Sequence, residues 1–280
     1  MDQQPIWYVD GHWVHPQEAC IPLTDVAVLR GYSVFESLRT YDRRPFRLDD
    51  HLDRLYRSAE LIDLMVPYTR QEIRAVLEET IRRNAFRHAS LRILVTGGGS
   101  EDGVLPSGKP LLAVMITPLP ERDLEAFQRG LRVITCRLRR EAPEAKTTNY
   151  IAAVRALKEA ARHGAADALF VDEQGYVLEG TRSNFFVFRG DTLITPREGM
   201  LPGVTRTVVL ELARDRFPIE ERPIALAELA SVDEAFLTAS SKEIMPVVQI
   251  DELIVGTGQA GPRTWELEQR FIALVEQGRF

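Results

Sequence analysis

The sequence predicts an α+β protein with two domains, and three patterns support this fold class. A hairpin signal opens the chain, where Asp10-Gly11 forms a tight two-residue turn between apolar segments at residues 6–9 and 12–14. Apolar residues then recur at helical spacing between residues 48 and 62. Farther along, several short apolar segments separated by turns lie between residues 168 and 194, a pattern typical of a strand-rich core.

Residues 1–120 are predicted to form a small α+β domain. After the opening hairpin, a second strand pair turns at residues 42–44, and two amphipathic helices follow it. The expected strands are 33–41, 45–48, 91–96 and 111–117, and the expected helices are 48–62 and 70–84. These elements together are expected to form a small unit with an antiparallel sheet.

Residues 131–280 are predicted to form a larger domain with a barrel-like mixed β core and surrounding helices. A linker is expected at residues 121–130, in a region with two prolines and several charges. The expected strands are 131–138, 168–172, 176–178, 184–188 and 192–194, and the expected helices are 149–163, 205–214 and 263–276.

The composition narrows the classes of function. The net charge of -6, with no basic run, argues against nucleic acid as the main ligand. The first residues contain no basic segment followed by an apolar one, and no stretch approaches 18 apolar residues, so we expect a cytoplasmic protein rather than a secreted or membrane protein. The two cysteines and five histidines have no metal-ligand spacing, so no metal is expected.

Only four lysines occur in the chain, and one of them has an unusual position. Lys109, Lys158 and Lys242 lie among polar residues or in turns and are expected at the surface. Lys146 lies between a predicted strand and a predicted helix, in the segment 144–150. An amine that forms a Schiff base must be deprotonated, and a lysine at a strand end facing a cofactor cavity can meet that need. An ordinary surface lysine in a loop fits the same residues.

Three further segments suggest the same kind of cofactor. Glu179 follows an apolar strand, where a carboxylate could face the ring nitrogen of pyridoxal and keep it protonated, or could simply end a strand. Residues 201–206 are expected to form a Pro-Gly turn that opens a helix, and free N–H groups there would suit a phosphate, although taken alone the segment is better explained by a plain helix start. The small residues and hydroxyls at 238–241 could close on an anion.

Together these segments resemble the class IV (fold type IV) pyridoxal-phosphate aminotransferases, which include branched-chain aminotransferases, D-amino-acid transaminases and aminodeoxychorismate lyases. Residues 146–150 (KTTNY) resemble the family's K-x-x-N-Y motif, and residues 179–185 (EGTRSNF) resemble E-G-x-x-x-N-[LIF]. Residues 201–206 (LPGVTR) resemble L-P-G-[IV]-T-R, and residues 51–55 (HLDRL) resemble H-x-x-R-L. The four motifs occur in the family's order, and the resemblance extends from residue 10 to residue 247.

The resemblance implies pyridoxal 5'-phosphate as the cofactor, makes the larger domain at residues 131–280 the cofactor-binding domain, and assigns roles to residues. Lys146 would bind the cofactor covalently and carry the proton between it and the substrate α-carbon. Glu179 would pair with the ring nitrogen, and Tyr150 with the phenolic oxygen. Arg54 would bind the phosphate. Further phosphate contacts would come from the backbone N–H groups of Val204 and Thr205 and from Ser240.

The candidates for binding the substrate carboxylate are Arg30, Arg92, Arg182 and Ser241. Arginine suits this role because its planar fork can bind both carboxylate oxygens. Arg30 lies in a segment, residues 28–32, that we interpret as a loop. In the resembled family this loop often reaches the active site of the neighbouring subunit, so the resemblance also implies a homodimer.

The residues around these arginines lead us to favour D-amino acids such as D-Ala or D-Glu as donors, with a 2-oxo acid as acceptor in a ping-pong reaction. Residues 90–93 lack the tyrosine and proline of the familiar branched-chain pattern, and residues 97–100 lack the familiar D-amino-acid carboxylate trap. Residues 29–32 and 96–99 resemble a less typical group of D-amino-acid transaminases. The alternative is an L-branched-chain-amino-acid aminotransferase. Further alternatives are an aminodeoxychorismate lyase and a non-catalytic binding protein on the same fold.

Overall fold

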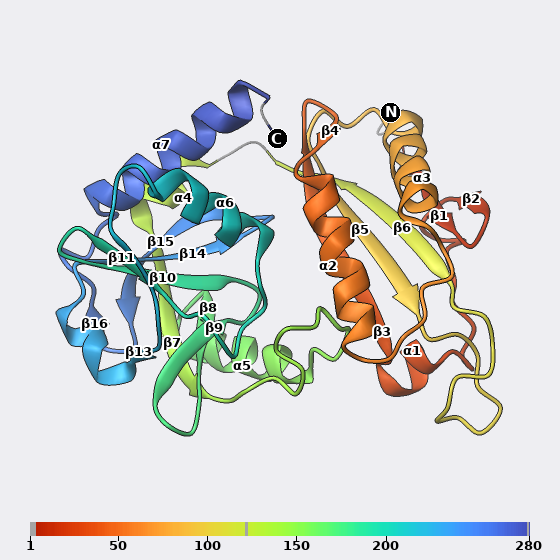
Figure 1. Ribbon diagram of the computed structural model, residues 1–280, viewed down its shortest axis with the longest axis horizontal. Helices are drawn as coiled ribbons and strands as arrows, with labels where there is room; N and C mark the ends of the chain where they lie inside the picture. Colours follow the sequence, from red (N-terminus) through yellow and green to blue (C-terminus); the bar gives the residue numbers. More distant parts are fainter. Residues whose placement is uncertain (1–3, 121–122, 279) are drawn as a thin grey trace. The chain divides into compact units, whose positions relative to one another are not determined.

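The structure is a computed structural model that describes residues 4–120, 123–278 and 280. The chain divides into two compact units, each built around its own sheet (Figure 1). Unit 1 comprises Met1–Glu121 and Ala145–Asn149, and unit 2 comprises Arg122–Glu144 and Tyr150–Phe280. The segment that contains Lys146 therefore belongs to unit 1, although its sequence position lies within the predicted second domain.

The predicted linker at residues 121–130 is mostly helical. Helix α4 (Leu124–Arg129) occupies it, and Asp123 caps the helix by accepting a hydrogen bond from the backbone of Ala126. Residues 121 and 122 lie outside the described residues. The sequence contains no apolar repeat long enough to indicate this short helix.

Unit 1 contains an antiparallel sheet with the strand order β2-β1-β6-β5-β3-β4. The strands are β1 (Trp7–Val9), β2 (His12–Val14), β3 (Ser33–Tyr41), β4 (Arg44–Pro45), β5 (Ala89–Thr96) and β6 (Leu112–Pro118). The predicted hairpin is confirmed, because Val9 pairs with His12 across Asp10-Gly11. Both turn residues have positive φ, as this kind of turn requires.

The helices of unit 1 are α1 (Val26–Arg30), α2 (Leu48–Glu60) and α3 (Arg70–Arg83). The apolar side of α2, including Leu52 and Leu55, is buried in one core with Val34 and Leu38 of β3. The strand expected at residues 45–48 is shorter than predicted, because Leu48 begins α2 and is buried in that core. The segment interpreted as a loop around Arg30 is also corrected: Arg30 is the last residue of α1.

Unit 2 contains a mixed sheet with the strand order β12-β11-β10-β14-β15-β7-β8-β9-β13, and β16 pairs with β15. Its strands are β7 (Leu131–Arg137), β8 (Asp167–Val171), β9 (Tyr176–Gly180), β10 (Asn184–Arg189), β11 (Thr192–Thr195), β12 (Ile219–Glu221), β13 (Ile224–Ala225), β14 (Glu234–Ala239), β15 (Glu243–Ile250) and β16 (Leu253–Ile254). Strands β9 and β10 lie close together although they are far apart in this order, so the sheet curls back on itself. This agrees with the predicted barrel-like mixed core.

The helices of unit 2 are α4, α5 (Ile151–Arg162), α6 (Val204–Ala213) and α7 (Pro262–Glu276), together with the 3-10 helix Leu226–Ser231. The sequence predicted α5, α6 and α7 to within about two residues at each end, which is the usual uncertainty of helix boundaries. Among the residues that the structure describes, no helix is both long and apolar enough to cross a membrane.

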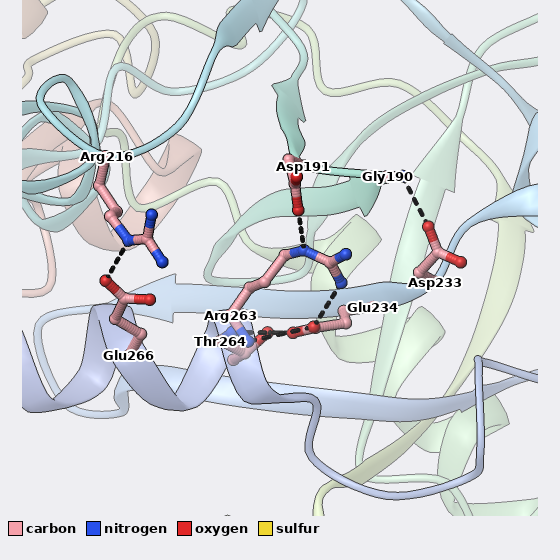
Figure 2. A network of polar contacts seen from close by, with 8 residues as sticks. All are labelled: Gly190, Asp191, Arg216, Asp233, Glu234, Arg263, Thr264 and Glu266. Carbon is pink, nitrogen blue, oxygen red and sulfur yellow. Dashed lines mark hydrogen bonds and ion pairs between the residues drawn. The ribbon is translucent and has the colours of Figure 1, made fainter.

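A remote carboxylate anchors the start of α7 (Figure 2). Glu234, the first residue of β14, accepts hydrogen bonds from the backbone N–H and hydroxyl of Thr264, both at 2.8 Å. Arg263 donates to the same carboxylate and to Asp191, at 3.1 and 3.0 Å. A carboxylate at a helix N-terminus accepts hydrogen bonds from the unpaired N–H groups there and interacts favourably with the helix dipole. The base of β14, which leads to residues 238–241, is thereby fixed.

Candidate active site

Lys146 lies along the edge of β3 in unit 1, and backbone bonds fix it on both sides. The N–H of Phe35 donates to the carbonyl of Lys146 at 3.0 Å, and the N–H of Lys146 donates to the hydroxyl of Ser58 in α2 at 3.1 Å. Its neighbour Thr147 forms a bridge with Val34. The Lys146 Nζ lies 4.6 Å from the centre of the Phe35 ring. The chain therefore presents this amine over an aromatic face from a backbone that is held in place.

Arg92 lies over the same aromatic ring. Its guanidinium is 5.2 Å from the centre of the Phe35 ring, while its side chain remains exposed. Arg92 of β5 pairs with Ser37 of β3. Ser37 lies two residues after Phe35, so Phe35, Ser37 and Arg92 are on the same face of the sheet. Arg92 and Lys146 therefore both contact the Phe35 ring.

Arg54 is held by a buried carboxylate that the sequence did not lead us to expect. Glu36 is fully buried and accepts two hydrogen bonds from Arg54, from Nε and Nη2, both at 2.8 Å. His51, also buried, lies 2.7 Å from the same carboxylate through Nδ1. Such a two-point bond fixes the plane of the guanidinium. Arg54 is therefore a precisely oriented buried cation rather than a solvated residue on the surface of α2.

Burial and charge set the ionisation of this cluster. Burial alone would raise the pKa of Glu36, but Arg54 and His51 lower the pKa well below its ordinary value, so the carboxylate is ionised. Burial lowers the pKa of His51, opposed by Glu36, and the charges of Arg54 and Lys146 lower it further. His51 is accordingly neutral at neutral pH.

Arg30 presents a different environment. It is the C-terminal residue of α1 and is exposed, and its Nη1 donates to the carbonyl of its neighbour Leu29 at 2.8 Å. Gly31 follows with positive φ and ends the helix. The carbonyl of Gly31 accepts a hydrogen bond from the hydroxyl of Thr148, two residues after Lys146.

In unit 2, the glutamate motif (residues 179–185) and the Pro-Gly turn (residues 201–206) are in direct contact. Glu179 is 5% exposed and accepts from the backbone N–H of Leu201 at 3.0 Å. Asn184 donates to the carbonyl of the same Leu201 at 2.7 Å. A Cβ on Gly203 would come within 1.9 Å of the Asn184 Oδ1, so only glycine fits beside this side chain. The motifs of residues 179–185 and 201–206 therefore form a single structural element.

Arg140 is a second residue that the sequence analysis missed. Its Nε donates to Oε1 of Glu179 at 2.8 Å, and both side chains are largely buried. The cation keeps a negative charge on Glu179 compatible with burial. No feature of the sequence around Arg140 distinguishes it from the other arginines of the chain. Glu36, in contrast, left a signal, because it occupies a core position of β3 between Val34 and Leu38.

The start of α6 provides the predicted group of backbone donors. Gly203 precedes the helix, Val204 and Thr205 are its first two residues, and both are buried. Within the described part of the chain, no side chain caps this helix, so its first N–H groups remain suited to an anion. Arg206 does not turn into this position, since it donates to the carbonyl of Pro196 and to Glu221.

The remaining predicted residues lie at turns and helix ends of unit 2. Tyr150 is half-buried at the start of α5, and Arg182 is exposed in the turn between β9 and β10. Ser240 and Ser241 occupy the turn between β14 and β15. Lys242 in the same turn was expected at a polar surface; instead its amine pairs with the buried Asp167 at 2.9 Å.

Two buried hydroxyls of unit 2 lack a hydrogen-bond partner among the described residues, those of Ser183 and Thr238. Thr238 pairs in register with Asn184, which adjoins Ser183, so both belong to the region of the glutamate motif. Buried polar groups are normally satisfied, so this region is suited to a polar ligand.

Comparison with known proteins matches the chain to aminotransferases in sequence and in structure. The family model described as "Amino-transferase class IV" matches residues 33–250. The chain is 35% identical over 274 residues to a putative branched-chain-amino-acid aminotransferase of Methanocaldococcus jannaschii, covering 94% of each. It is 32% identical over 278 residues to the D-alanine aminotransferase of Listeria monocytogenes, covering 96% of each. A solved structure of a branched-chain amino acid aminotransferase (T.th.) with pyridoxamine 5'-phosphate matches with a TM-score of 0.91 and 30% identity, over 98% of this chain and 94% of the other.

Proposed function

The chain belongs to the class IV aminotransferases, and on this premise we propose that it uses pyridoxal 5'-phosphate to move an amino group from an amino acid to a 2-oxo acid. The observation that carries the proposal is the amine of Lys146, held 4.6 Å from the Phe35 ring by backbone bonds to β3 and α2. Bound pyridoxal phosphate supplies a carbonyl that takes up the amino group and a ring that withdraws electrons from the α-carbon.

The residues present fit this cofactor. Lys146 would hold it covalently, and the carboxylate of Glu179, which forms an ion pair with Arg140, would accept a hydrogen bond from the ring N–H. Arg54 and the first N–H groups of α6, at Val204 and Thr205, would bind the phosphate. Ser240 would add a hydroxyl and Tyr150 would donate to the phenolic oxygen.

Each residue would then have a defined task during turnover. Once the incoming amino group has replaced it on the cofactor, the amine of Lys146 would carry the proton from the substrate α-carbon to the cofactor, because a general base must reach the proton that it moves. Arg92, which shares the Phe35 ring with Lys146, would hold the substrate carboxylate, and Arg30, Arg182 and Ser241 are further candidates for carboxylate contacts. Glu36 keeps Arg54 in the plane that its phosphate contact requires.

For the substrate, we propose L-branched-chain amino acids first and D-amino acids second. The sequence patterns around Arg30 and Arg92 favoured D-amino acids. The similarity to proteins named branched-chain aminotransferases, at up to 35% identity, supports the alternative better. One comparison supports D-amino acids: the chain is 32% identical to a D-alanine aminotransferase over nearly its whole length.

A panel of four donors tests this choice. The purified holoenzyme is mixed with L-Leu, L-Val, D-Ala or D-Glu, and the change in cofactor absorbance is followed without an acceptor. We expect the L-amino acids to react roughly 10- to 100-fold faster, because the opposite hand cannot keep its charged carboxylate bond while presenting its α-hydrogen to Lys146. Rapid reaction with D-Ala and none with L-Leu would overturn the first choice in favour of the second.

We also propose that the protein forms a homodimer through an apolar patch of unit 1. The patch consists of Leu23, Val28, Leu29, Val104 and Leu105, which are 38–80% exposed. Its two segments lie side by side, since Asp25 bridges Gly99 and the N–H of Ser100 donates to the carbonyl of Thr24. A second copy of the chain is a suitable partner for exposed apolar surface of this kind, which also surrounds Arg30.

Light scattering after size-exclusion chromatography measures this assembly. The wild type is expected to have twice the mass of the chain. The variant Leu29→Glu/Leu105→Glu is expected to run as a monomer with reduced activity, because charges would be buried without partners. Ile254→Glu, at an exposed apolar residue of unit 2, serves as the matched control. A fully active monomeric wild type would contradict the proposal.

A further inference from the structure

Asp167 connects two turns of unit 2 that carry candidate site residues. It is the first residue of β8 and is completely buried. Its Oδ1 accepts from the hydroxyl and the backbone N–H of Thr181, at 2.5 and 3.3 Å. Its Oδ2 accepts from the amine of Lys242 at 2.9 Å. The two oxygens of one carboxylate thus hold two segments that are distant from each other in the sequence.

Each of these partners lies next to predicted substrate or cofactor residues. Thr181 precedes Arg182 in the turn from β9 to β10. Lys242 follows Ser240 and Ser241 in the turn from β14 to β15, and its N–H donates to the carbonyl of Ala239 to close that turn. Neither Arg182 nor Ser241 is itself buried, so their positions depend on the turns that carry them.

Asp167 and Lys242 form a largely buried ion pair, and burial limits the positions that the two side chains can take. Burial would raise the pKa of Asp167, but Lys242 and the hydrogen bonds of Thr181 and Ala168 lower the pKa below its ordinary value. The carboxylate is therefore ionised, and its partner Lys242 is only 22% exposed. In some proteins a buried ion pair adds little stability compared with apolar packing and instead specifies a single arrangement of the segments that it joins.

We propose that Asp167 is a positioning residue that sets the arrangement of Arg182 relative to Ser240 and Ser241, and thereby substrate affinity. The inference rests on the proposed aminotransferase function and deepens it. Asp167 itself does not contact the substrate. It acts by holding the two turns in register, through Thr181 on one side and Lys242 on the other. Loosening either bond would let one turn move independently of the other.

The test removes each bond separately with closely matched variants. Thr181→Val keeps the shape of the side chain and loses its hydroxyl, and Thr181→Ser keeps the hydroxyl. Lys242→Gln removes the charge, and Lys242→Arg retains it. For each holoenzyme, KM and kcat are measured with L-Leu and D-Ala. The affinity for 4-methylpentanoate, a branched carboxylate without an amino group, is measured by calorimetry.

We expect Thr181→Val and Lys242→Gln each to raise KM about tenfold and to weaken 4-methylpentanoate binding equally, as one lost buried hydrogen bond would. The value of kcat and the visible spectrum should remain within about twofold of the wild type. Thr181→Ser and Lys242→Arg should restore most of the affinity. Because both bonds act through Asp167, the double variant should lose less than the product of the single losses.

Variants that lower only the melting temperature, with KM and 4-methylpentanoate affinity unchanged, would overturn the inference and show a purely structural ion pair. Fully multiplicative losses in the double variant would also overturn it, because the two bonds would then act independently. A wild type that transfers no amino group from any donor would instead overturn the proposed function. The two failures are therefore distinguishable.

Discussion

Replacing Lys146 with alanine is expected to lower kcat by about 10⁴-fold, the upper range for the loss of a general acid–base group. The amine is the group that we propose to hold the cofactor and to move the α-proton, and Phe35 and the backbone of β3 position it for both tasks. Alanine leaves the backbone bonds of this segment possible, so the fold should persist. Steady-state rates and the visible spectrum of the cofactor-loaded variant measure the loss.

Lys158→Ala is the matched control, because Lys158 is an exposed residue of α5 that belongs to none of the motifs of the proposed site. It should leave the rate within about twofold of the wild type, as expected for a surface substitution away from a site. A Lys146→Ala enzyme that retains wild-type turnover would refute the assigned role.

The second large effect is expected at Glu36, where substitution by alanine should destabilise the protein by about 3–5 kcal/mol. The change removes the two hydrogen bonds that the buried Arg54 guanidinium donates to this carboxylate and leaves its charge without that compensation. Urea unfolding measures the loss. Cofactor affinity should fall as well, because Arg54 is no longer held in one plane.

Asp49→Ala provides the comparison for Glu36→Ala. Asp49 pairs with Arg74 at the surface of unit 1, where both side chains are exposed. Such pairs contribute about 0–1 kcal/mol, so this variant should be close to the wild type in stability. Equal and small effects of the two substitutions would contradict the assignment of Glu36 as the residue that orients Arg54.

The ionisation of Glu36 also predicts how the stability of the protein changes at low pH. Burial opposes ionisation of this carboxyl, but Arg54 and His51 lower its pKa in the folded state below the ordinary value of 4.5. A depressed pKa contributes stability that is present above the unfolded-state pKa and is lost as the pH falls through the folded-state pKa. Below about pH 4.5, the wild type should therefore lose stability more steeply than Glu36→Gln, which cannot titrate.

Hydrophobic periodicity and turn residues correctly predicted the elements whose own local sequence is enough to identify them. The Asp10-Gly11 hairpin and the amphipathic helices α2 and α3 lie where their patterns placed them. Strands β14 and β15 were not predicted, because the turn between them contains serines and a lysine rather than glycine or asparagine. Glu243 adopts a positive φ there, a conformation that its residue type does not indicate.

The residues of the proposed site also differ in how far the sequence could identify them. Lys146 and Glu179 could be selected from the sequence because their motifs have a fixed spacing. Arg140 and Asp167 could not, because their roles depend on contacts with Glu179 and Lys242 that lie far away in the chain. Lys242 was misjudged for the same reason: a polar local sequence does not reveal a buried partner 75 residues away.

The central claim is that Lys146 carries the cofactor, and chemical trapping tests it most directly. Borohydride reduction of the holoenzyme fixes a cofactor that is bound to an amine as a Schiff base, and mass spectrometry of the peptides then identifies the modified lysine. We expect one modified residue among the four lysines of the chain, Lys146. Modification of Lys109, Lys158 or Lys242 instead, or no modified lysine in a cofactor-loaded protein, would contradict this claim.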